Sequence, residues 1–219
     1  MKTLLAVVLL FSLPAFLHPQ GTVKGQPEIP GNIDLRQMLN RPSFIYSHVD
    51  SVKEGEKVWI TMETDVQICT PLSLGQIRGV ITDYNRYTRT FKRTTASHIV
   101  ESNKQGIIAF FEVTVGALGI TVVTAYSVLM ESPIDSPEKF LLTFSHVSDN
   151  GSIRNVHGFW YLQAVTIDGQ PHTYLRYYSY YEPLRVNMLQ RQVTAWFIGA
   201  ENATMVEEVL AAAALRPKF

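Results

Sequence analysis

The stretch IRNVHGFWYLQAVTIDGQPHTYLRYYSYYEP at residues 153–183 carries the strongest fold signal in the chain. Residues 153–167 and 172–181 are two strand-like segments, and the Asp-Gly dipeptide between them is typical of a tight hairpin turn. Apolar residues then recur at helical spacing between residues 184 and 215, with Gly199 as an interruption. These residues predict an antiparallel hairpin followed by a long C-terminal helix that bends or divides at Gly199.

Further strands are predicted towards the N-terminus, between turn-forming residues, at 94–101, 107–115, 120–131 and 140–147. Residues 58–68 alternate between apolar and polar side chains and predict a half-buried strand. Thr70 and Pro71 predict the start of two small helices within residues 71–90, because proline suits the first helical position. This order predicts an α+β fold, in which a curved antiparallel sheet of about six to seven strands wraps round the C-terminal helix. Such a sheet leaves a hollow between itself and the helix.

The composition limits the function classes. The chain has 219 residues, 46% of them hydrophobic, and its 19 basic and 19 acidic residues include no basic run, so no nucleic-acid partner is predicted. Six histidines are scattered without metal-ligand spacing, and no phosphate-binding loop or catalytic triad pattern is present. The sequence therefore predicts no metal site and no cofactor, and it favours a binding protein over an enzyme.

The N-terminus predicts export. Residues 1–20 join a cationic start to a short apolar stretch, as signal peptides do, and an uncleaved leader that keeps the protein near the membrane is the alternative. Cys69 is the only cysteine, which excludes an internal disulfide and favours a bacterial periplasmic or secreted protein. Residues 21–57 are predicted as a linker or loosely attached arm with a possible extra strand at 44–52, and residues 58–216 as the folded domain.

Four motifs occur in a fixed order: VITDYNRY at residues 80–87, GFWYL at 158–162, the Asp-Gly turn at 168–169, and YEP at 181–183. Together they resemble the START-like, helix-grip (SRPBCC) superfamily, in its polyketide cyclase/dehydrase-like branch. The resemblance implies a cavity between the sheet and the C-terminal helix that binds a lipid or another hydrophobic small molecule. Some members of the superfamily catalyse cyclisation or dehydration, so the fold does not choose between carrier and enzyme.

Candidate ligand-binding residues follow from bulk and polarity. Trp160 is either cavity wall or a core residue, and tyrosine hydroxyls on the last strand would hold the polar end of an amphipathic guest. Arg176 would pair with a carboxylate or phosphate of the guest, or instead with a local acid. Which strand faces line the cavity stays open, because a one-residue shift in register exchanges them. The candidate set is Phe111, Tyr126, Trp160, Tyr174, Arg176, Tyr178, Met188 and Trp196.

Two alternatives remain open. An enzyme of the cyclase or dehydratase type would use Glu112, Arg176, His157 or a tyrosine as its acid or base. A non-binding envelope interaction module would fill the cavity with its own aromatic rings and dock through residues 21–57. His146 and His157 flank one hairpin and are expected as a solvent-exposed pair.

Overall fold

The computed structural model describes residues 26–31, 33–39, 44–54, 57–117, 120–149, 151, 153–183 and 188–217. Within these ranges it gives the backbone alone at residues 44, 51–54, 57–59, 115–117, 120, 122 and 188–199. The predicted signal peptide at residues 1–20 lies outside the described part.

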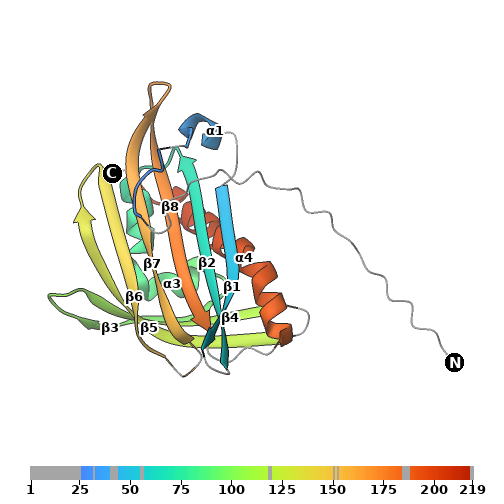
Figure 1. Cartoon of the computed structure of the whole chain (residues 1–219). Coiled ribbons are helices and arrows are strands. Elements are labelled where there is room, and N and C mark those ends of the chain that lie inside the picture. The colour runs from blue at the N-terminus through green and yellow to red at the C-terminus, as the bar shows by residue number, and fades with distance from the viewer. Residues whose placement is uncertain are drawn as a thin grey trace, which may run out of the picture.

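The described strands form one antiparallel sheet in the order β1-β2-β8-β7-β6-β5-β4-β3 (Figure 1). The strands are β1 (Phe44–Glu54), β2 (Lys57–Thr70), β3 (Thr94–Ser102), β4 (Ile107–Ala117), β5 (Ile120–Asp135), β6 (Lys139–Asp149), β7 (Ile153–Ile167) and β8 (Gln170–Pro183). The possible extra strand at 44–52 is present as β1, so this sheet has eight strands. The two residues of the β7–β8 turn, Asp168 and Gly169, have φ angles of 50° and 76°, as the predicted tight hairpin requires.

Helices precede β1, follow β2 and end the described part of the chain. They are α1 (Leu35–Leu39), α2 (Leu74–Ile81), the 3₁₀ turn η1 (Tyr84–Arg86), α3 (Tyr87–Thr90) and α4 (Met188–Ala214). The predicted helix start at Thr70 and Pro71 is wrong by one turn. Ser73 is the N-cap instead, because its hydroxyl accepts from the Gln76 amide and the Gln76 side chain accepts from the Ser73 amide.

Of the two alternatives at Gly199, the division into two helices is wrong, because α4 runs as one helix through this residue. A glycine inside a helix costs only about 1 kcal/mol relative to alanine. Contacts of α4 with β1, β2, α2 and α3 offset this cost.

The sheet has an inner face and an outer face, and alternate residues of each strand take opposite faces. On the inner face, Val66, Trp160 and Leu175 share a core with Ile77 of α2 and Val209 of α4. On the outer face, α1 and the residues before it cover part of the sheet. In Figure 1 the strands pass in front of α4. The helix therefore lies across the inner face, as the predicted fold class requires.

Strand β2 is covered on both faces, so the prediction of a half-buried strand is wrong for its C-terminal part. Asp65 and Gln67 point to the outer face, yet they are only 4% and 0% exposed. The covering residues belong to the segment predicted as a loosely attached arm, in which Pro30 and Met38 are buried. Residues 26–39, as far as they are described, are therefore packed against the sheet.

Candidate functional site

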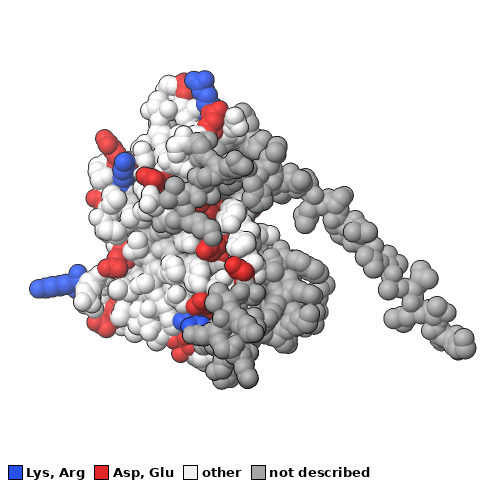
Figure 2. Space-filling model, viewed as in Figure 1, with Lys and Arg blue, Asp and Glu red and all other residues white. Residues whose placement is uncertain are grey.

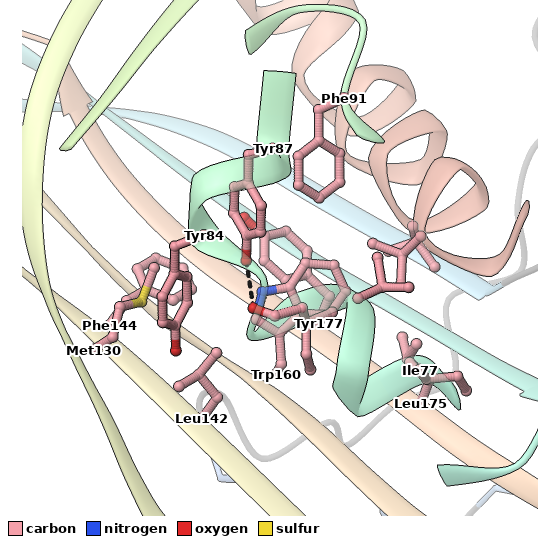
Figure 3. Close-up of a cluster of buried hydrophobic side chains, with 14 of the residues drawn as sticks. Ile77, Tyr84, Tyr87, Phe91, Met130, Leu142, Phe144, Trp160, Leu175 and Tyr177 are labelled. Carbon is pink, nitrogen blue, oxygen red and sulfur yellow. Dashed lines mark hydrogen bonds between the residues drawn. The ribbon is translucent and has the colours of Figure 1, made fainter. Parts of the chain in front are cut away.

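Aromatic rings fill one end of the interior, where α2 and α3 meet the sheet (Figure 3). The ring of Tyr87 stacks on Phe111 at a centroid distance of 5.1 Å and meets Phe91 edge-on at 4.6 Å. The Tyr87 hydroxyl donates to the carbonyl of Ile81 at 2.6 Å. Because these groups contact one another and the Tyr87 hydroxyl is satisfied, this end is packed core.

Three tyrosines lie further along the inner face, towards the hairpin between β6 and β7. Tyr177 packs on Trp160 at a centroid distance of 4.4 Å, Tyr126 lies 6.1 Å from Phe111, and Tyr181 packs against the same core. Burial raises the pKa of Tyr177 to about 12, and it also raises the pKa values of Tyr126 and Tyr181. These phenols stay protonated at neutral pH, so they provide hydroxyl groups without charge.

His146 and Asp149 are on the inner face as well. In the sheet His146 stands opposite Val128, and Asp149 stands opposite Tyr126. Val128 is core and Tyr126 packs against it, so their partners point inwards too. The distance from His146 Nε2 to Asp149 Oδ2 is 3.0 Å, and the two side chains are 19% and 12% exposed. The interior therefore contains a close contact between an imidazole and a carboxylate.

The predicted exposed pair of His146 and His157 is wrong. The two residues lie on opposite faces, because His157 stands opposite Ser145, the neighbour of His146. His157 stacks on Tyr180 at 4.6 Å on the outer face, and burial lowers its pKa.

The structure places the predicted ligand-binding residues on two opposite faces of the sheet and on α4. Phe111, Tyr126 and Trp160 come together on the inner face. Tyr174, Arg176 and Tyr178 lie on the outer face, with Cys69, Leu141 and Phe159. The side chains of Met188 and Trp196 are outside the described part of α4.

The polar groups on the outer face bind one another. Tyr174 donates its hydroxyl proton to Gln67 Oε1 at 2.8 Å, and Arg176 is bonded to Asp65. The second interpretation of Arg176, a pair with a local acid, is therefore confirmed. Figure 2 views the outer face, on which acidic residues stand at separate places, while Arg176 is only 1% exposed.

Three of the candidate acids and bases for an enzyme, Glu112, Arg176 and His157, are outside the interior, whereas candidate tyrosines are inside it. Glu112 accepts from the Thr95 hydroxyl at 2.6 Å on the outer face, next to exposed β3. His157 and Arg176 are on the outer face too. Sequence reasoning missed His146, although the alternation of Phe140, Leu142 and Phe144 inwards continues to it.

Within the described ranges, no group of three or more His, Cys, Asp or Glu side chains is placed to hold a metal ion. Among the helices of the same ranges, none combines the length and the apolar character needed to cross a membrane.

Comparison of the sequence with protein-family models and with curated proteins finds no match. Solved structures do match. Human StAR-related lipid transfer protein 5 has a TM-score of 0.57 at 10% identity, over 76% of this chain and 86% of that protein. A STAR-related lipid transfer protein from Xanthomonas axonopodis has a TM-score of 0.54 at 10% identity, over 76% of this chain and 98% of that fragment.

The Zhui aromatase/cyclase from a Streptomyces species has a TM-score of 0.53 at 13% identity, over 70% of this chain and 94% of that one. At such low identity the likeness shows the fold and does not transfer activity. The antiparallel sheet, the helices after β2 and the C-terminal helix over the inner face agree with it. The chain therefore has the START-like, helix-grip fold that its motifs predicted.

Proposed function

We propose that this protein binds a lipid or another hydrophobic small molecule between the inner face of the sheet and α4. The observation that carries the proposal concerns Tyr126 and Tyr181. Both rings are deep enough for burial to raise their pKa values, yet both keep part of their surface accessible. Accessible surface on deeply placed rings indicates room for a guest beside them.

The shape of the interior supports the same conclusion. The end near α2 is packed with rings, whereas Tyr126 and Tyr181 lie further along the inner face, towards the hairpin between β6 and β7. Apolar side chains there, including Phe144 and Val156, would contact the guest. The structural neighbours that are named for lipid transfer or aromatase/cyclase activity share this architecture.

The proposal is tested with diphenylhexatriene, an apolar hydrocarbon that fluoresces when it leaves water. Full-length protein is expected to bind it with saturation. Thr124 faces inwards, where its side chain is hydrogen-bonded to Tyr181, and the next residue, Ala125, faces outwards. Thr124→Trp should weaken binding about tenfold or more, because an indole occupies the space of the guest.

Ala125→Trp is the matched control, because it increases side-chain volume more than Thr124→Trp does, but on the opposite face of the same strand. Circular dichroism and melting temperature verify that both variants fold. Absence of saturable binding in the parent protein would refute the proposal, and so would equal effects of the two folded variants.

We further propose that the protein acts in the bacterial periplasm or is secreted. The support is the cationic, then apolar, sequence of residues 1–20 and the single cysteine, Cys69. Mass spectrometry of protein from its native host separates the alternatives. Loss of about the first 20 residues indicates a cleaved signal peptide, and an intact Met1 in the membrane fraction indicates an uncleaved leader. An intact chain in the cytoplasmic fraction would contradict export.

A further inference from the structure

We propose that His146, Asp149 and Tyr126 form a polar subsite that binds the hydroxyl group of a neutral amphipathic alcohol. This inference rests on the proposed function, because the subsite would hold the polar end of the hydrophobic guest. It assigns a ligand class: long-chain or polycyclic alcohols, as opposed to carboxylates.

The first step is the convergence of the three side chains. Asp149 stands directly opposite Tyr126 on the neighbouring strand, and His146 stands opposite Val128, two residues further along β5. Residues at these positions share one face of the sheet and lie within side-chain reach. Asp149 also raises the pKa of Tyr181, which places its carboxylate near a second inner hydroxyl.

A β-bulge makes this convergence possible. The register shifts between Ser127 and Val128, so that Ser148 and His146 are their partners and Val147 is left over. Without the bulge, His146 and Asp149 would point to opposite faces, because they are an odd number of residues apart. His146 continues the inward alternation of Phe144, and the bulge turns Asp149 inwards as well, so that the two side chains meet at 3.0 Å.

The second step is the state of the imidazole. Asp149 is close to Nε2 of His146, and the amide of Gly151 donates to the same carboxylate. A neutral imidazole has one ring nitrogen that donates a hydrogen bond and one that accepts. Within the described part of the chain, Nε2 of His146 is buried without a hydrogen-bond partner, although it lies 3.0 Å from Oδ2 of Asp149.

The third step is the match to a ligand. The neutral imidazole of His146 offers an acceptor nitrogen, and the Tyr126 hydroxyl offers a donor. An alcohol both donates and accepts, so one hydroxyl group satisfies both. A carboxylate only accepts, and it would face the nearby negative charge of Asp149. The phenols of Tyr126 and Tyr181 add no positive charge that would offset this repulsion, so the subsite discriminates against acids.

The experiment uses full-length protein loaded with diphenylhexatriene at neutral pH, and decanol and decanoate as competitors of equal chain length. Decanol is expected to displace the probe at a concentration about tenfold lower than decanoate. Tyr126→Phe removes one oxygen atom and should lower the preference for decanol over decanoate about three- to tenfold, with both competitors measured against the probe affinity of the same variant. His146→Phe should have the same selective effect.

His157→Phe is the matched control, because it removes an imidazole from the outer face and should leave the preference for decanol unchanged. If His146→Phe does not fold, Tyr126→Phe still decides the question. Equal competition by decanol and decanoate, or an unchanged preference for decanol in folded Tyr126→Phe, would overturn the subsite alone. Failure of diphenylhexatriene to bind the parent protein overturns the proposed function, and the subsite falls with it.

Discussion

The guanidinium of Arg176 and the carboxylate of Asp65 form an ion pair that is buried on the outer face of the sheet. Nη2 lies 2.6 Å from Oδ2, and Nε lies 3.1 Å from both carboxylate oxygens. Nη1 donates to the carbonyls of Gln26 and Glu28 at 2.8 and 3.1 Å. The guanidinium therefore connects two adjacent strands to the N-terminal segment.

Asp65→Asn is expected to destabilise the protein by about 3–5 kcal/mol, because it leaves the Arg176 charge buried without its counter-charge. The free energy of unfolding from urea titration measures the loss. Asp168, which pairs with Arg36 at 2.7 Å with 62% and 72% of the two side chains exposed, provides the comparison. Asp168→Asn should cost less than about 1 kcal/mol. If Asp65→Asn and Asp168→Asn lose the same free energy of unfolding, the buried ion pair of Arg176 stabilises the protein no more than an exposed one.

Removal of the N-terminal segment is the second test of the outer face. A chain that begins at residue 40 lacks Met38 and the two carbonyls that bind Arg176, whereas a chain that begins at residue 26 keeps them. Burial of one Met side chain stabilises by about 1.5–3 kcal/mol, and hydrogen bonds to a charged group add about 1.5–3 each. The shorter chain should therefore be roughly 4.5–9 kcal/mol less stable than the longer one. Similar melting temperatures for the two chains would show that residues 26–39 do not stabilise the sheet.

Gly158 is required by close packing on the inner face. A Cβ atom added there would lie 2.1 Å from the carbonyl oxygen of Tyr178 and 2.5 Å from the Phe144 ring. Gly158→Ala should therefore destabilise by about 1–3 kcal/mol or more, since both neighbours must shift. Gly75, in helix α2, has no heavy atom within 4 Å of such a Cβ. Gly75→Ala should stabilise the protein by about 0.5–1 kcal/mol. Urea titration should therefore show changes in unfolding free energy of opposite sign for Gly158→Ala and Gly75→Ala.

The fold could be predicted from the sequence because short sequence patterns indicate its hairpins and its terminal helix. Turn residues such as Asp168 and Gly169 separate the strands, and the last strand is followed directly by helical spacing. The direction of the faces could not be predicted. Tyr174 and Leu175 are neighbours on opposite faces, and each is 0% exposed. When both faces are buried, alternation of apolar and polar residues does not tell which one adjoins the helix.

The candidate site was predictable only in part for a related reason. Trp160, Phe111 and Tyr126 are bulky strand residues, and composition was enough to select them. Asp149 is brought inwards by the register shift after Ser127, and a bulge of one residue has no unambiguous mark in a single sequence. Tertiary pairing, not local pattern, therefore decides where the His146–Asp149 pair points.

His157 gives a prediction for the pH dependence of stability. Burial lowers its pKa in the folded protein, and the nearby Glu182 and Glu63 offset only part of this effect. In the unfolded chain its pKa is near the ordinary value of about 6.5, so below that pH the unfolded state binds more protons. The contribution of neutral His157 is therefore complete above about pH 6.5 and is lost as the pH falls towards the folded pKa.

His157→Phe keeps a ring beside Tyr180 but cannot be protonated, so its stability should fall less steeply than that of the parent protein between about pH 8 and pH 5. Urea titrations at several pH values in this range measure the two slopes. The difference at about pH 8, where His157 is neutral in both states, serves as the baseline and removes any change in packing. A variant whose curve runs parallel to the parent curve would show that protonation of this imidazole does not oppose folding.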